Sequence, residues 1–318
     1  MSDIAIASRG VRKAFGPDDR ILEGADLEVD TGEILLLMGP NGVGKTVLLS
    51  CLAGSERPTA GTVEVFGEPA HERDGGDVGF LLQNSVAVDT LTGRENVRFY
   101  AGVHPTFTDR WQRYVAELGI EDDLGKLVKH YSEGMKRKLE FSLTLSGESS
   151  IYLLDEPTAG VDLTNIQRFH DVILEQYERG KTFVISSHRP MDATIADRIA
   201  FMPDGTISAV GRPEDLLEGV PRVVRVAGRE AMTAAQEYVV GGQLFPLGGE
   251  ARGFLADEHT IANLEAAIAD RDGTQHAAVT TVEPNYTDLF NYYVHVRNDY
   301  EDAHSSGDHL TTHRNPDQ

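Results

Sequence analysis

The sequence predicts an α/β protein built on a mostly parallel sheet, with a smaller α/β unit toward its C-terminus. Short apolar runs alternate with helix-like stretches over residues 1–220, which is the pattern of such a sheet. The 318 residues, of which 40% are hydrophobic and 25% charged, suit about two folded domains. We therefore expect one domain at 1–220, a small accessory domain at 221–300 and a disordered polar tail at 301–318.

Continuous apolar runs predict strands that are buried on both faces, at 33–38, 151–154 and 182–185. The runs 198–202 and 206–210, separated by Pro203-Asp204-Gly205, predict a hairpin. A strand is also expected at 277–282, in the second domain. Apolar residues at helical spacing predict helices at 109–118, 133–145, 165–179 and 260–269.

The chain is strongly acidic. Its formal net charge is -22, which disfavours broad electrostatic binding to nucleic acid or to anionic lipid. Solubility alone accounts for such a charge. We favour a second interpretation, adaptation to a salt-rich cytoplasm in which lysine gives way to carboxylates.

Nothing in the sequence indicates export or a membrane span. No run approaches the ~18 apolar residues that a membrane helix needs, and the N-terminus lacks a signal pattern. The single cysteine, Cys51, excludes internal disulfides and zinc sites built from several cysteines, and its apolar surroundings predict a buried side chain. We expect an intracellular, soluble protein.

A phosphate-binding motif follows the first buried strand and precedes a helix-like stretch. Its glycines allow the backbone to wrap around phosphate oxygens, and the N–H groups at the start of a helix supply positive potential. Lys45 would reach the β- and γ-phosphates, and the hydroxyl of Thr46 would ligate Mg²⁺. The motif consists of Gly39, Pro40, Asn41, Gly42, Val43, Gly44, Lys45 and Thr46.

Two acids follow the second buried strand. In a parallel sheet the carboxyl ends of the strands share one edge, so Asp155 is expected near the phosphate-binding loop. One carboxylate would hold the Mg²⁺ shell, and the next, Glu156, would orient a water for attack on the γ-phosphate.

These motifs and five others, ordered along the chain as in that family, resemble the nucleotide-binding subunit of ATP-binding cassette (ABC) transporters over residues 4–217. Tyr131-Ser132-Glu133-Gly134-Met135 stands where that family has its signature loop, and Ser186-Ser187-His188 resembles its switch-histidine segment. The remaining matches are single residues: Phe15 (the aromatic that stacks on adenine), Gln83 (the Q-loop) and Asp162 (the D-loop).

The resemblance implies a P-loop NTPase core with an antiparallel β subdomain and a helical subdomain. It implies two subunits that face head to tail, each ATP lying between one P-loop and the signature loop of the other subunit. Ser132 and Gly134 would then serve the nucleotide of the partner. His188 would contact the γ-phosphate, and Gln83 would sense Mg²⁺ where a transmembrane partner docks.

The signature loop departs from the family pattern at two positions. Glu133 replaces a small residue and Met135 replaces a glutamine, whereas Ser132 and Gly134 are kept. A carboxylate beside a phosphate is unfavourable unless its side chain points away, so we expect Glu133 to do so.

The resulting prediction is an ATPase that powers an ABC transporter, with ATP and Mg²⁺ as cofactors. Its partners would be a second copy or a related ATPase subunit and a separate transmembrane permease, with no nucleic acid. The segment 282–290 resembles the ending of export-type subunits, which favours an exporter. We expect the protein in the cytoplasm, peripheral on the inner face of the cell membrane.

The alternative is a soluble ABC ATPase that acts on DNA or ribosomes. The acidic charge, the lack of zinc cysteines and the presence of a single cassette argue against it.

Two other features of the sequence are not assigned a function. The cluster Lys136-Arg137-Lys138 predicts a solvated helix face, and the histidines of the tail predict no metal site: His304, His309 and His313.

Overall fold

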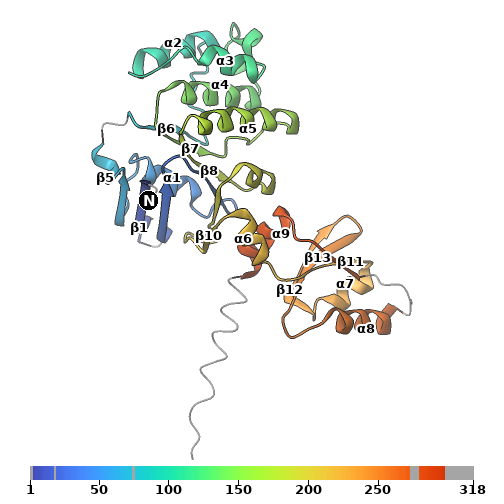
Figure 1. Ribbon diagram of the computed structural model, residues 1–318. Helices are drawn as coiled ribbons and strands as arrows, with labels where there is room; N and C mark the ends of the chain where they lie inside the picture. Colours follow the sequence, from blue (N-terminus) through green and yellow to red (C-terminus); the bar gives the residue numbers. More distant parts are fainter. Residues whose placement is uncertain (1–2, 18, 74–75, 273–278, 298–318) are drawn as a thin grey trace, which may run out of the picture. The chain divides into compact units, whose positions relative to one another are not determined.

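The computed structural model describes residues 3–17, 19–73, 76–272 and 279–297 (Figure 1). The chain forms two compact units, Met1–Val210 and Gly211–Gln318. Helix α6 (Pro213–Glu218) is grouped with the second unit, and the domain boundary at residue 220 stays a prediction. The tail at 301–318 with its three histidines lies outside the described residues, as do residues 277–278 of the last expected strand.

A six-stranded sheet forms the centre of the first unit, with strand order β10-β9-β3-β8-β7-β6. β3 pairs in parallel with β8 and β9, and β7 pairs in parallel with β6 and β8. Every residue of β3, β7 and β8 is buried, so the three predictions of doubly buried strands are confirmed. The strands span β3 (Ile34–Met38), β6 (Val78–Leu81), β7 (Ile151–Asp155), β8 (Thr182–Ser187), β9 (Arg198–Phe201) and β10 (Ala209–Gly211).

The predicted hairpin at the edge of this sheet differs in one respect. β10 begins at Ala209 and not at residue 206. The N–H of Ser208 donates to the carbonyl of Phe201, so the residues between β9 and β10 form a longer connection than Pro203-Asp204-Gly205 alone.

An antiparallel sheet with strand order β2-β1-β4-β5 packs against the central sheet. Val11 and Leu27 from this sheet share one core with Leu48 and Leu52 of the first helix, α1 (Lys45–Leu52). This sheet is the antiparallel β subdomain that the resemblance implied. Its strands span β1 (Ile4–Gly16), β2 (Asp19–Asp30), β4 (Ala60–Val65) and β5 (Glu68–Pro69).

Helices α2, α3 and α4 gather at the end of the first unit that lies away from β1 and β5 (Figure 1). Val97, Val115 and Leu139 bring the three helices into one apolar core, which forms the implied helical subdomain. The helices of the first unit after α1 span α2 (Gly93–Val103), α3 (Trp111–Glu117), α4 (Glu133–Ser146) and α5 (Leu163–Glu178). Short 3₁₀ turns lie at η1 (Ala70–Glu72), η2 (Glu121–Asp123), η3 (Val128–His130) and η4 (Pro190–Ile195).

The second unit is a small α/β fold, as predicted, with more strands than the sequence indicated. Its elements follow the order βαββαβ, and its antiparallel sheet has the order β12-β13-β11-β14, the split βαβ arrangement of ferredoxin-like folds. These elements span β11 (Val223–Ala227), α7 (Arg229–Ala235), β12 (Val239–Leu247), β13 (Glu250–Leu255), α8 (Ile261–Asp272) and β14 (Val279–Val282).

Two further helical segments complete the second unit, α9 (Tyr286–Asn291) and the π-helical η5 (Tyr292–Val296). The ring of Tyr292 lies 5.3 Å from that of Phe254 on β13, so this segment packs on the sheet. Among the described residues of both units, no helix combines the length and the apolar character that crossing a membrane requires.

Candidate nucleotide-binding site

The loop between β3 and α1 has the backbone geometry that a phosphate cradle needs. Gly44 has a φ of 103°, a conformation that residues with a side chain rarely adopt. A Cβ on Gly39 would lie 2.1 Å from the carbonyl oxygen of Met202, so this position has room for glycine alone. The loop therefore needs glycine at these positions for conformational and steric reasons.

A pocket of about 290 Å³ opens at this loop, beside the N-terminus of α1. It brings together residues of the phosphate-binding motif, the Q-loop and the end of β7. Its lining residues are Ile21, Asn41, Gly42, Gly44, Lys45, Thr46, Val47, Gln83 and Glu156.

Lys45 lies at the bottom of the loop and is 5% exposed. Its Nζ donates to the carbonyls of Gly39 and Pro40, at 2.9 Å each, and lies 3.8 Å from Oε1 of Glu156. Burial lowers the pKa of Lys45, whereas the carboxylates of Glu156 and Asp155 act in the opposite direction. The ammonium is thus held where a phosphate group would meet it.

Oxygen donors suited to Mg²⁺ lie at the same edge of the sheet. Oδ1 of the fully buried Asp155 accepts a hydrogen bond from Ser186 Oγ at 2.5 Å, and its Oδ2 is buried with no hydrogen-bond partner among the described residues. Thr46 Oγ1 and Gln83 Oε1 lie 3.5 Å apart. Hydroxyl, amide and carboxylate oxygens are the ligands that Mg²⁺ prefers, so the residues present fit this ion.

Glu156 has its carboxylate in the pocket and its backbone in a strained conformation. Oε1 lies 3.2 Å from Nδ1 of His188, at the end of β8. The residue has a φ of 47°, which is unusual outside glycine and typical of residues in functional sites. Its N–H donates to both the carbonyl and the hydroxyl of Ser186, which holds the strained peptide in place.

This strain gives a stability prediction. Glu156→Gly and Glu156→Ala both remove the carboxylate, but only glycine relieves the positive φ. We expect the glycine variant to be more stable than the alanine variant by about 1 kcal/mol, the scale of the left-handed penalty. Denaturant unfolding of the two purified variants measures the difference, and equal stabilities would mean that the backbone at residue 156 is not strained.

Nine predicted site residues are not among those that line this pocket. Gly39, Pro40 and Val43 belong to the phosphate-binding loop itself, and Asp155 and His188 lie next to Glu156. The other four come from elsewhere in the first unit: Phe15, Ser132, Gly134 and Asp162. Phe15, at the end of β1, is 59% exposed, and the ammonium of Lys13 lies 4.9 Å from the centre of its ring. The side chain of Asp162 caps α5 by accepting from the N–H of Asn165.

The signature residues begin helix α4. The hydroxyl of Ser132 accepts from the N–H of Met135 at 3.2 Å, so it serves as the cap of the helix. Glu133 is exposed, and the expectation that its carboxylate points away from a bound phosphate stays a prediction. A Cβ on Gly134 would lie 3.1 Å from the carbonyl oxygen of Gly160, so this residue lies directly beside the loop that leads to Asp162.

The interpretation of Lys136-Arg137-Lys138 as a solvated face is wrong for Arg137. This residue is buried and donates to backbone carbonyls, because position 137 shares its helix face with the buried Glu140 and Phe141. Two further contacts were not predicted: the hydrogen bonds of Ser186 to Asp155 and Glu156, and those of the buried Glu140. The sequence does contain a signal for the burial of Arg137. Glu140 and Phe141 follow it by three and four residues, so the three side chains share one helix face, and the apolar Phe141 indicates that this face is buried.

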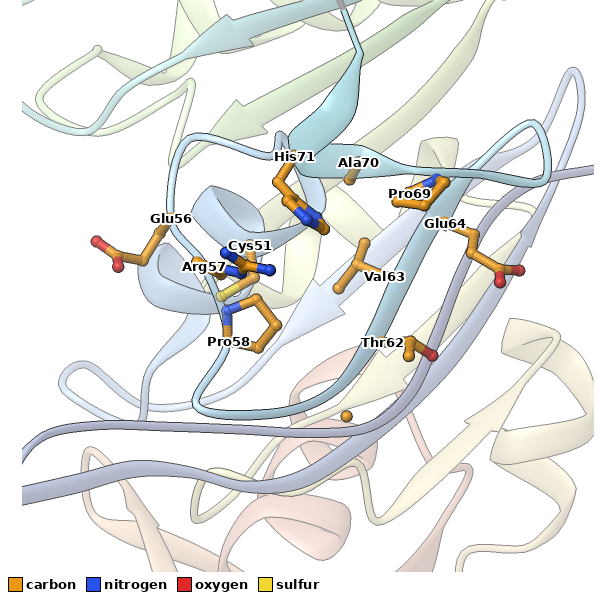
Figure 2. A pocket seen from close by; sticks show the side chains of 11 residues that line it. Cys51, Glu56, Arg57, Pro58, Thr62, Val63, Glu64, Pro69, Ala70 and His71 are labelled. Carbon is orange, nitrogen blue, oxygen red and sulfur yellow. The ribbon is translucent and has the colours of Figure 1, made fainter.

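A second pocket, of about 260 Å³, shares no lining residue with the first. It lies between the end of α1 and strand β4, where Cys51, Arg57, Pro58 and Val63 contribute side chains (Figure 2). The prediction that Cys51 is buried is confirmed, and this burial raises the pKa of its thiol to about 11. The thiol is therefore uncharged at neutral pH and unsuited to nucleophilic chemistry.

A glycine-rich loop between a buried parallel strand and a helix, with a buried lysine in the loop and an Asp-Glu pair at the end of another strand of the same sheet, defines a P-loop nucleotide-binding protein. Comparison with known proteins narrows the class. The family model described as ABC transporter matches residues 22–159.

Two bacterial relatives show similarity over well above half of the chain. The fluoroquinolones export ATP-binding protein of Mycobacterium tuberculosis is 36% identical over 203 residues, which cover 61% of this chain and 66% of the relative. The daunorubicin resistance ATP-binding protein DrrA3 of Streptomyces coeruleorubidus is 32% identical over 224 residues, covering 68% of this chain and 71% of the relative. The chain therefore belongs to the family of ABC transporter ATP-binding proteins.

The fold agrees with this assignment. A solved structure described as a dimeric bacterial ABC transporter cassette superposes with a TM-score of 0.60 at 22% identity. The match covers 65% of this chain and 98% of that cassette.

Proposed function

We propose that the chain is the ATP-binding and ATP-hydrolysing subunit of an ABC transporter of the export type. The observation that carries this proposal is the carboxylate of Glu156 in the P-loop pocket, 3.2 Å from His188 Nδ1 and 3.8 Å from Lys45 Nζ. A base, a phosphate-binding cation and a second polar side chain thus converge on the place where a γ-phosphate would lie.

The catalytic work divides among a few residues. Backbone N–H groups of residues 39–46 and the ammonium of Lys45 bind the phosphates and stabilise their charge. Glu156 orients and polarises the attacking water, and His188 contacts the γ-phosphate from the other side. Thr46, Gln83 and Asp155 would hold Mg²⁺, which would supply neutralisation of the charge on the phosphate oxygens. Phe15 contributes an exposed aromatic face for the adenine.

The active species is a dimer with a second copy of the chain or with a related ATPase subunit. Ser132, Gly134 and Asp162 are absent from the lining of the chain's own pocket. Ser132 is exposed, however, and the first N–H groups of a helix such as α4 have no carbonyl acceptor within the helix. These groups suit the phosphates of a nucleotide bound to the facing subunit. The dimeric cassette with a similar fold supports this arrangement.

A separate transmembrane permease is the second partner, and it places the chain at the cytoplasmic face of the membrane. Apolar side chains are exposed next to the Q-loop and on α2, among them Val86 (49% exposed), Phe99 (50%) and Val103 (63%). The hydroxyl of Tyr100 on α2 donates to the carbonyl of Val86, which ties these two segments together. This surface suits a permease contact, and the names of the two bacterial relatives support export or resistance as the outcome.

We also infer adaptation to a salt-rich cytoplasm. The net charge of -22 opposes ATP binding at long range, whereas at molar salt the Debye length falls to ~3 Å and this field is screened. Binding then depends on the local N–H groups, Lys45 and Mg²⁺.

Phosphate release from ATP by the purified chain tests the proposed function. With Mg²⁺ we expect steady hydrolysis. Chelation of the metal should lower the rate at least ~100-fold, because the ion would stabilise the charge that develops in the transition state by several kcal/mol. ATP binding without hydrolysis in the presence of Mg²⁺ would identify a nucleotide sensor. Strong stimulation by DNA or ribosomes would favour the soluble alternative.

A further inference from the structure

Arg137, on helix α4, donates to the backbone on both sides of Glu156. Its side chain is 6% exposed. The guanidinium donates through Nη2 to the carbonyl of Asp155 and through Nε to the carbonyl of Pro157 at 3.4 Å. Nη1 donates to the carbonyl of Leu82, the residue before the Q-loop glutamine. One side chain therefore holds the peptides next to two predicted catalytic positions.

Glu140 lies one turn later on the same helix and holds the segment that follows the Q-loop glutamine. Its Oε1 accepts from the hydroxyl of Ser85 at 2.6 Å, from the N–H of Val86 at 2.6 Å and from the N–H of Ala87 at 3.0 Å. The residue is 3% exposed. Three donors on one buried oxygen fix the path of this segment against α4.

The two side chains also form an ion pair, with Oε2 of Glu140 3.9 Å from Nη1 of Arg137. A buried ion pair contributes little to stability compared with apolar packing of the same volume. Here most of its hydrogen bonds go to main-chain groups of loops that carry Gln83 and Glu156. Such a pair is suited to fixing the positions of those loops.

We propose that Arg137 and Glu140 are positioning residues that fix Glu156 and Gln83 to helix α4 for ATP hydrolysis. This inference rests on the proposed ATPase function. The strained φ of Glu156 requires surroundings that hold the peptide on both sides, and Arg137 supplies those contacts. Because α4 begins at Ser132, the helix that would touch the partner's nucleotide is joined directly to this chain's own hydrolytic residues.

The variants Arg137→Met and Arg137→Lys test this role. Methionine removes all three donated hydrogen bonds. Lysine keeps the charge, but its compact ammonium lacks the planar fork of the guanidinium and cannot donate to the three separate carbonyls at once. We expect kcat to fall about 10-fold or more in both variants, since small displacements of reacting groups cost this much. The affinity for ATP should stay within about threefold of the wild type, because the phosphate-binding loop is untouched.

A matched control is Arg113→Met. Arg113 lies on α3, is half exposed, and pairs with Glu117 on the same helix and with Glu175 on α5. This control should keep the wild-type kcat. A lysine variant that melts like the wild type, binds ATP like the wild type and has a wild-type kcat overturns the proposal. A parallel loss of ATP affinity and kcat also overturns it, since that pattern indicates a collapsed pocket.

The methionine variant is not required for this decision. If it fails to fold, Arg137→Lys and Glu140→Gln, both of similar size to the native residues, are compared with the control by the same three measurements. Wild-type kcat in both of them contradicts the positioning role. A wild-type chain that binds ATP without hydrolysing it contradicts the proposed function itself, so the two failures are distinguishable.

Discussion

Replacing Glu156 by glutamine is expected to lower ATP turnover by about 100-fold or more while leaving ATP binding intact. Glutamine keeps the size of the side chain and its place beside His188, but it no longer accepts a proton from the attacking water, a contribution that ranges from about 10² to 10⁴ in rate. The substitution leaves the residues of the P-loop unchanged, so their N–H groups should still bind the phosphates. Phosphate release and nucleotide titration on the same preparation measure the two effects separately.

The control for this variant is Glu148→Gln, which changes an exposed carboxylate that pairs with Arg110 and Lys181. It should retain the wild-type rate. Hydrolysis by Glu156→Gln at the rate of this control would remove Glu156 from the mechanism and leave water activation to another group.

Replacing Lys45 by alanine is expected to abolish tight ATP binding. The ammonium is buried at the bottom of the phosphate loop, and hydrogen bonds to charged groups contribute roughly 1.5–3 kcal/mol. The affinity should therefore fall about 10- to 100-fold, with hydrolysis lost at ordinary ATP concentrations. Titration with ATP, followed by calorimetry, measures the change.

Lys126→Ala provides the comparison, because this exposed lysine pairs with the nearby Asp123 and lies outside the pocket. It should bind ATP as the wild type does. Wild-type affinity in Lys45→Ala would mean that the pocket at the P-loop is not the principal ATP site.

The contiguous parts of the site could be predicted from the sequence. The P-loop is a local segment in which glycine spacing, the preceding strand and the following helix carry the signal together, and the Asp155-Glu156 pair ends a strand whose apolar run is unmistakable. Parallel strands then bring these segments to one edge of the sheet. Short-range sequence patterns therefore predict the fold class, the phosphate-binding loop and the Asp155-Glu156 pair.

Other parts depend on contacts between distant segments. Ser186 bonds to Asp155 and to the N–H of Glu156 across neighbouring strands, and no local pattern specifies that pairing. Arg137 was assigned to a solvated face because adjacent basic residues were treated as a unit, although successive positions on a helix point in different directions. The structure also shows strain at Glu156, which residue identity alone does not indicate.

The small second unit was harder to predict for a related reason. The Gly241-Gly242 pair in β12 has positive φ values, and the strand register shifts between Val239 and Leu244. Such an irregularity breaks the alternation by which a strand is recognised. The βαββαβ topology therefore emerged only from the pairing of the strands.

The molecular mass of Glu156→Gln in solution, with and without ATP, tests the central claim most directly. That claim is that ATP joins two chains head to tail and that Glu156 ends this state by hydrolysis. Light scattering should show a monomer without nucleotide and a dimer with ATP, and the additional change Lys45→Ala should prevent the dimer. A monomer that has bound ATP, or a dimer of the same mass without ATP, would contradict the account.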